Sequence, residues 1–378
     1  MLGRSVHGDH DLLKALTVVL GTAGAAALLS KRLHQPVVLG YIVAGLVVGP
    51  NVGVPLVADP EVVSTLSELG VVLLMFSLGL EFSLRKLIRV GAGVAITAII
   101  QCSLLFWLGF TVGRAFGWTT LESLFTGAIL AISSTTIIAK AFDEQGIKGR
   151  MRELVVGVLI VEDLIAILLM ATLTAVANGA GLSAGALAST AARLAGFLVA
   201  LVVLGLLVIP RATRRITAMK RPEVTLVASV AVCFGIALLA RELGYSVALG
   251  AFLAGSLIAE SGEELVIEHL VRPVRDLFGA VFFVSVGMMM DPSLMAQHWV
   301  PILVLTVIVV VGKIVGVGLG AFLTGNGART SIQAGMSLAQ IGEFSFIIAA
   351  LGLSLGATRE FIYPVAVAVS AITTLLTP

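Results

Sequence analysis

The sequence predicts an all-α polytopic membrane protein of about 13 transmembrane helices, built as two copies of one helical unit in opposite orientations. Three observations support this: an apolar composition, basic loops on alternate sides, and an internal repeat. Hydrophobic residues make up 58% of the 378 residues and charged residues 12%, against about 45 to 50% and about 25% in soluble domains. This length fits about a dozen spans of about 20 residues, so we expect one membrane domain over residues 1–378.

Apolar runs of membrane-spanning character recur along the chain and are separated by short polar loops. Each run is taken as one span because a helix of about 20 apolar residues crosses a bilayer. The predicted spans are 12–30, 37–49, 62–80, 90–116, 121–142, 153–176, 190–209, 224–239, 246–259, 269–290, 300–323, 331–355 and 361–376.

The distribution of basic residues gives an orientation. Of the 24 Lys and Arg residues, 17 fall on one side of this arrangement and six on the other, and Lys313 lies inside a span. Because basic loops stay in the cytoplasm, we expect the N-terminus outside and the C-terminus in the cytoplasm.

An internal repeat relates the two halves of the chain. Residues 27–45 match residues 237–255 at nine of 19 positions without a gap, and residues 76–79 resemble residues 284–287 at nearly the same shift. An odd number of predicted spans separates the copies, so the second is inserted upside down. This predicts an inverted-topology repeat, with copies over about 12–176 and about 224–376, as in many secondary transporters.

Two adjacent acids, Glu162 and Asp163, lie near the middle of an apolar span. A carboxylate at mid-bilayer costs about 2.5 to 3.5 kcal/mol on insertion scales, so the pair needs a reason. Neighbours on a helix point about 100° apart, so the two acids are expected to serve different partners. The alternative is a buried ion pair that only locks two helices together.

Two spans are interrupted by polar residues at positions that the repeat relates. Ser133, Ser134, Thr135 and Thr136 stand in a row, and Gln340, Gly342 and Glu343 interrupt the corresponding later span. Hydroxyl groups can satisfy backbone groups that unwinding exposes, so both spans are predicted to be discontinuous. The alternative is that the hydroxyls bond back within an unbroken helix.

Lys313 lies deep in an apolar span, with an apolar turn or more on each side. Its ammonium cannot readily reach the membrane surface and therefore needs a buried acid. We expect Glu162 to be this partner, which leaves Asp163 to face a cavity.

At these residues the chain resembles the second family of monovalent cation:proton antiporters, which includes Kef-type K+/H+ and NapA-like Na+/H+ exchangers. The resemblance extends over essentially the whole chain. It rests on the order of several short segments, namely 39–50, 74–81, 133–136, 161–164, 282–288 and 342–344.

This resemblance implies an NhaA/NapA-like antiporter fold with two crossed discontinuous helices. It implies core helices over about 62–176 and 269–355 that move against dimerisation helices, mainly the remainder, in a homodimer. Asp163 resembles the ion- and proton-binding carboxylate. Glu162 departs from the Asp, Asn or Gln of many relatives, and its pairing with Lys313 resembles the charge arrangement of electrogenic exchangers.

The resemblance also favours K+ over Na+ and a bacterial-type inner membrane. Kef-type relatives carry a cytoplasmic nucleotide-binding regulatory domain after the last span. This sequence stops where that domain would begin, so it is expected to be a shortened form of such a protein.

The expected mechanism is competition between a monovalent cation and a proton at Asp163, with oxygens of Ser134 and Thr135 as further ligands. K+ or Na+ and H+ are then transported ions, and no cofactor is expected. The alternatives are a Na+-coupled symporter of organic anions and a channel-like cation efflux system. An intramembrane hydrolase is not favoured, because adjacent carboxylates on one helix do not converge. Nucleic acid is not expected as a partner, because the sequence has no basic patch typical of nucleic-acid binding.

Overall fold

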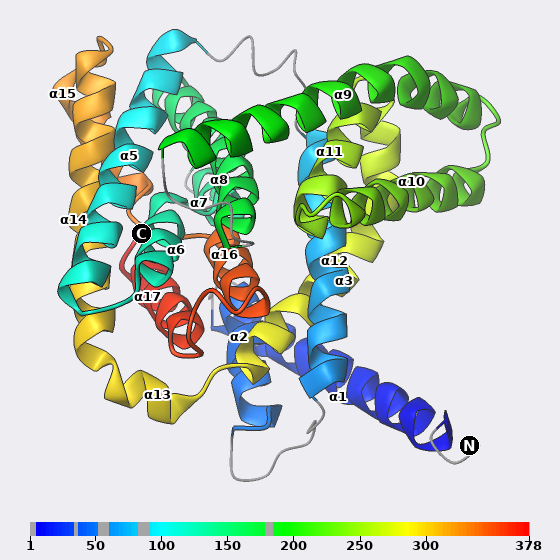
Figure 1. The fold of residues 1–378 in the computed structure, drawn as a ribbon, viewed down its shortest axis with the longest axis horizontal. Coiled ribbons are helices and arrows are strands. Elements are labelled where there is room, and N and C mark those ends of the chain that lie inside the picture. The colour runs from blue at the N-terminus through cyan, green and yellow to red at the C-terminus, as the bar shows by residue number, and fades with distance from the viewer. Residues whose placement is uncertain are drawn as a thin grey trace. The chain divides into compact units, whose positions relative to one another are not determined.

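The structure is a computed structural model that describes residues 5–33, 37–51, 60–81, 91–144, 146–177 and 184–377. Within these ranges the chain is helical and contains no β-strand, which confirms the all-helical prediction there (Figure 1). Five described helices are long and apolar enough to cross a membrane, at residues 13–32, 92–115, 150–175, 222–242 and 299–323. Several apolar helices of 10–17 residues accompany them. The number of spans stays a prediction.

Contacts between residues divide the chain into two compact units. The first unit covers residues 1–83, 201–243 and 247–292, and the second covers residues 84–200, 244–246 and 293–378. Residues 62–81 and 269–292 of the predicted core fall within the first unit, and the described remainder of that core falls within the second. Which helices serve as core or dimerisation helices stays a prediction.

The helices follow the predicted spans closely, and two spans are each divided into two helices. The first unit contains α1 (Ser5–Arg32), α2 (Val37–Val48), α3 (Pro60–Glu81), α10 (Pro222–Glu242), α11 (Val247–Ala259) and α12 (Glu264–Met288). The second contains α5 (Ala92–Ala115), α6 (Thr120–Ala131), α7 (Thr135–Glu144), α8 (Arg150–Ala175), α14 (Trp299–Leu323), α15 (Ala328–Ser337), α16 (Glu343–Ser354) and α17 (Ile362–Leu376). The chain passes from the second unit to the first within α9 (Ala184–Thr217), and a short unpredicted helix, α13 (Pro292–Gln297), precedes α14.

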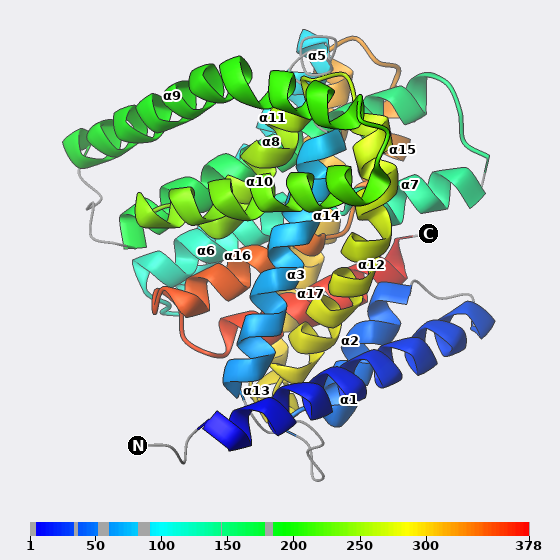
Figure 2. The same cartoon turned by 90° about the vertical axis from the view of Figure 1, so that its right-hand side faces the viewer.

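In the first unit, α3 packs along α11 and α12, and Figure 2 shows α3 alongside α12. Two glycine pairs bring helix backbones into direct contact. A Cβ atom on Gly79 would lie 3.0 Å from the Cα of Gly255, and one on Gly45 would lie 2.9 Å from the Cα of Gly287. Small residues allow this close helix packing in membranes.

In the second unit, α5 packs against α6, α8 and α14, and α14 also contacts α15 and α17. A capping box begins α6, because Thr119 and Glu122 exchange side-chain and backbone hydrogen bonds. The Glu122 carboxylate also accepts a hydrogen bond from Arg359, with Nη2 and Oε2 2.9 Å apart. This pair ties the start of α6 to the turn before α17.

The predicted orientation of the termini also stays a prediction. It depends partly on Arg85, Lys86 and Arg89, which lie outside the described residues.

Candidate functional site

The first helix break separates α6 from α7 at residues 132–134. Its Ser134 hydroxyl lies 3.3 Å from the backbone nitrogen of Ile137 and accepts that hydrogen bond, as an N-cap residue does for a new helix. The last carbonyls of α6 have lost their helical donors. The carbonyl of Ala131 instead accepts hydrogen bonds from Lys313 Nζ and Gln101 Nε2, each at 2.8 Å. The helix is therefore discontinuous here, as the hydroxyl-rich sequence predicts.

The second break separates α15 from α16 and lies against the first. The backbone nitrogen of Gly342 donates to the carbonyl of Ile132 at 3.1 Å, and the hydroxyl of Ser133 donates to the carbonyl of Leu338 at 3.2 Å. Backbone groups released in each span thus find partners in the other span. The two breaks form one hydrogen-bonded unit.

Gln340 joins the two breaks through its side chain, which is fully buried. Its Oε1 accepts from the backbone nitrogen of Ser134, and its Nε2 donates to the carbonyl of the same residue, both at 3.3 Å. A side-chain amide offers a donor and an acceptor side by side, so it pairs with both the N–H and the C=O of a single residue, Ser134. This explains why a side-chain amide is found at position 340.

Gly342 is where the two breaks approach most closely. A Cβ atom added there would lie 2.5 Å from the backbone nitrogen and Cα of Ser134. We expect Gly342→Ala to push the breaks apart and to destabilise the protein by about 1 to 3 kcal/mol. We expect the transport rate to fall by a larger fraction than the stability does. Thermal unfolding in detergent and transport in liposomes would measure both.

The matched control is Gly327→Ala. Gly327 is also an N-cap glycine, it precedes α15, its φ is −65°, and no atom lies within 4 Å of a Cβ built there. A loss in Gly327→Ala equal to that in Gly342→Ala would contradict the close-approach explanation.

Glu162 and Lys313 form a fully buried ion pair, with Nζ and Oε2 3.4 Å apart. Glu162 Oε2 also accepts a hydrogen bond from the backbone nitrogen of Ser133 at 2.7 Å. Lys313 in turn donates to the hydroxyl of Ser133 at 2.7 Å and to the carbonyl of Ala131. The ammonium therefore lies at the C-terminal end of α6, where the helix dipole favours a cation.

Asp163 has a different environment from its neighbour. Its side chain is buried, with 4% of the residue exposed, and its Oδ2 accepts a hydrogen bond from the Thr135 hydroxyl at 3.1 Å. Thr135 is the first residue of α7. The positive end of a helix dipole therefore lies on the side of this carboxylate. The adjacent acids thus serve different partners, as expected from their spacing on α8.

A third carboxyl group belongs to the same cluster. The hydroxyl of Ser134 donates to Glu343 Oε2 at 2.6 Å, and Glu343 is the first residue of α16. The described cluster therefore contains three carboxyl groups, of Glu162, Asp163 and Glu343, and one ammonium, of Lys313, which pairs with Glu162. A cluster with this balance of charge favours a bound cation or proton over an anion.

The structure brings all the predicted site residues to the two breaks and the adjacent helices. The side chain of Thr136, the fourth hydroxyl of the first break, lies outside the described residues. Sequence reasoning missed Gln101, a fully buried residue on α5. Its signal was available, because it is a single amide within a long apolar span. It also missed the buried hydroxyls of Ser370 and Thr373 on α17, which contact the second break.

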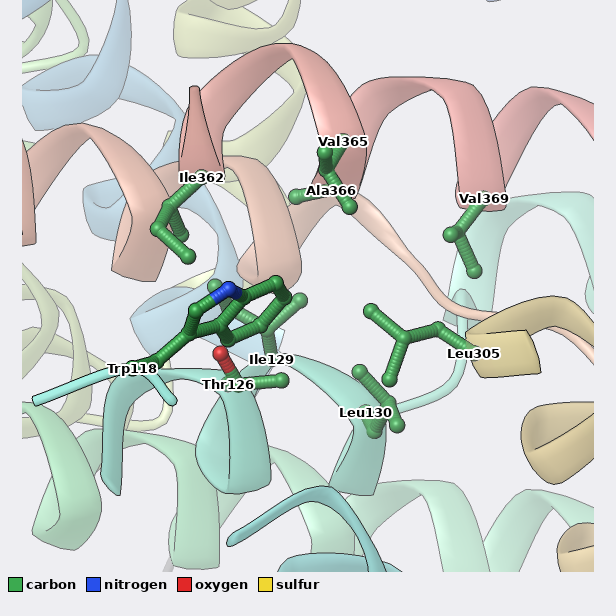
Figure 3. A pocket seen from close by; sticks show the side chains of 9 residues that line it. All are labelled: Trp118, Thr126, Ile129, Leu130, Leu305, Ile362, Val365, Ala366 and Val369. Carbon is green, nitrogen blue, oxygen red and sulfur yellow. The ribbon is translucent and has the colours of Figure 1, made fainter. Parts of the chain in front are cut away.

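An apolar cavity lies between α6, α14 and α17 (Figure 3). Its lining includes Trp118, Leu305 and Val369, and Thr126 is its polar residue. The hydroxyl of Thr126 donates to the carbonyl of Glu122 at 2.8 Å. Cations need oxygen ligands, so the carboxyl cluster is the better candidate for an ion site.

The fold described above is that of a membrane protein built from apolar helices, and comparison with known proteins identifies its family. The family described as "Sodium/hydrogen exchanger, transmembrane" matches residues 15–378. The chain therefore belongs to the sodium/hydrogen exchanger family.

Among similar proteins is K(+) efflux antiporter 4 of Arabidopsis thaliana, which is 33% identical over 98% of this chain and 63% of its own length. Another is the glutathione-regulated potassium-efflux system protein KefC of Salmonella typhi, 34% identical over 90% of this chain and 55% of its own length. The Na(+)/H(+)-K(+) antiporter GerN of Bacillus cereus is 31% identical over 98% of this chain and 95% of its own length. The chain thus spans about three fifths of the first two relatives and nearly all of the third.

The fold is also similar to a solved structure. The sodium proton antiporter MjNhaP1 of Methanocaldococcus jannaschii superimposes with a TM-score of 0.69 over 97% of this chain and 95% of that chain, at 16% identity. At this identity the likeness shows the fold alone.

Proposed function

We propose that this chain is a secondary antiporter that exchanges a monovalent cation for protons by alternating access, with Asp163 as the carboxylate that binds both. The observation that carries this proposal is the buried Asp163 at the meeting point of two helix breaks, next to a separate, already paired acid and lysine. Either ligand neutralises the carboxylate. A neutral site crosses the membrane barrier more easily than an empty charged one, which couples the two ions.

The surroundings of Asp163 support a small cation as the substrate. The Thr135 hydroxyl contacts Asp163, while Ser134 and Glu343 contact each other at the facing break. Oxygen ligands of this kind suit hard cations. Lys313, the basic group of the described cluster, is already engaged by Glu162, Ser133 and Ala131. This weakens the alternative of an organic anion symporter, which needs a basic group for its substrate.

We propose an inverted-topology repeat with two crossed discontinuous helices as the scaffold of this site. The glycine contacts support it, because the repeat shift relates Gly45 to Gly255 and Gly79 approximately to Gly287. The pairs Gly45–Gly287 and Gly79–Gly255 are then two copies of one contact. The two facing breaks are likewise related by the shift.

All the site residues fall within the second compact unit. This supports an elevator-type movement, in which the unit carries Asp163 and its ligands across the membrane as one body. A homodimer that anchors the remaining helices and a bacterial-type inner membrane belong to the same proposal. The family supports them.

K+ is the proposed preferred cation, with Na+ second. The support is the similarity over at least 90% of this chain to proteins named for potassium efflux. GerN, named for both ions, keeps Na+ as the alternative.

The test is proton movement in proteoliposomes that hold a pH gradient, followed with a pH-sensitive dye while K+, Na+ or choline is added outside. Ionophores would clamp the membrane voltage. We expect K+ to dissipate the gradient at lower concentrations than Na+, and choline to leave it unchanged. Cation flux without proton movement would favour a channel. If neither K+ nor Na+ causes proton movement, the proposal is contradicted.

A further inference from the structure

The last helix, α17, contacts the second break through hydroxyl groups. Ser370 Oγ donates to the carbonyl of Ile341 at 2.9 Å, and the backbone nitrogen of Ile341 donates to Thr373 Oγ1 at 3.4 Å. The hydroxyl of Thr377 lies 3.2 Å from the carbonyl of Ala339, although it also lies 2.8 Å from the carbonyl of Thr373 in its own helix. Ser370 and Thr373 of α17 thus form hydrogen bonds with both backbone polar groups of Ile341.

These contacts are made where water has no access. Ser370 is 4% exposed, and Thr373 and Ile341 are fully buried. Ile341 lies between α15 and α16, so neither of its backbone groups has a helical partner. A buried peptide without partners is costly, and α17 supplies the partners that the broken helix lacks.

The residues on either side of Ile341 are those that contact the first break. Gln340 pairs with both backbone polar groups of Ser134, and the backbone nitrogen of Gly342 donates to the carbonyl of Ile132. The next residue, Glu343, accepts from the Ser134 hydroxyl. The backbone that α17 holds at Ile341 thus belongs to the short segment, residues 340–343, that makes these three contacts with the first break.

We propose that Ser370 and Thr373 are positioning residues for cation binding, which hold the Ile341 peptide so that Gln340 and Glu343 reach Ser134 beside the Asp163 site. Neither hydroxyl touches the transported ion. The inference rests on the proposed antiport function. It adds a determinant of cation affinity that lies on a different helix from the carboxylates.

The test uses Ser370→Ala, Thr373→Val and their combination in proteoliposomes. The net value of one buried hydrogen bond converts to roughly three- to tenfold in an equilibrium constant. We expect the double variant to raise the KM for the cation by about tenfold or more, with the maximal rate changed by less than about threefold. Thr373→Ser keeps the hydroxyl, so its KM should stay within about twofold of the unmodified protein.

The matched control is Thr374→Val. Thr374 is the next residue on α17, is 6% exposed, and makes no hydrogen bond to the break among the described contacts. An equal KM increase in Thr374→Val and Thr373→Val would overturn the proposal. If the double variant does not fold, the two single substitutions decide by the same comparison.

Hydrogen–deuterium exchange gives a readout that does not depend on transport. We expect Thr373→Val to accelerate exchange in the peptide that contains residues 339–342 by roughly three- to tenfold, while Thr374→Val leaves it unchanged. Unchanged exchange in Thr373→Val would overturn the positioning role even if antiport is shown. Accelerated exchange in a protein that moves no protons would support the contact and contradict the antiport function.

Discussion

Asp163→Asn is expected to abolish cation-driven proton movement while leaving a folded protein. Asn has nearly the shape of Asp and can still accept a hydrogen bond from Thr135, which lies 3.1 Å from Asp163 Oδ2. It cannot release a proton or neutralise a cation. The proteoliposome measurement with K+ or Na+ should therefore fall to the level of empty liposomes, a loss of at least about 100-fold if the carboxylate is the shared site.

Two further variants sharpen this prediction. Asp163→Glu keeps the charge but moves it by one methylene, so we expect slow but measurable exchange. Asp276→Asn changes an aspartate whose side chain is 60% exposed, and it should exchange at the normal rate. Proton movement driven by the cation in Asp163→Asn would show that another group carries the exchange.

Lys313→Met is expected to cause the largest loss of stability of any substitution at the site. It leaves Glu162 fully buried without its cation and removes a donor from the carbonyl of Ala131. Breaking a buried ion pair by removing one partner costs about 3 to 5 kcal/mol, whereas removing both partners is often nearly neutral. Lys313→Met combined with Glu162→Gln should therefore recover most of the loss in thermal unfolding.

The same double variant separates two roles for Lys313. If the lysine stabilises the fold through Glu162, the double variant keeps cation-driven proton exchange because Asp163 is unchanged. Lys148→Met, at an exposed lysine, is the control for loss of one positive charge. A folded double variant without exchange, or one as unstable as Lys313→Met alone, would contradict the structural role.

Much of the fold could be predicted because a bilayer imposes simple rules on sequence. The apolar runs predicted the helices closely; for example, the expected span 153–176 corresponds to α8, Arg150–Ala175. The grouping of helices into units was harder to predict. It depends on backbone contacts such as Gly79 with Gly255, and a glycine in an apolar run does not reveal its partner.

The site was predictable where charge or hydroxyl groups stood out against an apolar background. Glu162, Asp163 and Lys313 are conspicuous in this way, and the structure places Lys313 against the acid chosen for it. Ser370 and Thr373 were not recognised because a hydroxyl in a membrane helix usually bonds back to its own helix. Thr373 does this too, donating to the carbonyl of Val369 at 2.8 Å. Its contact with Ile341 could not be predicted without knowing which backbone segment packs against α17.

The ion pair between Glu162 and Lys313 also has a consequence for how the protein is made. The two residues are separated by 151 positions, so at about 5 to 20 residues per second Lys313 is synthesised about 8 to 30 s after Glu162. During that interval the acid has no cation, and the first break lacks the donors that the second break supplies. The carboxyl group therefore enters the membrane before its buried partner has been synthesised. Biogenesis of the first half is complete only when the second half has been translated.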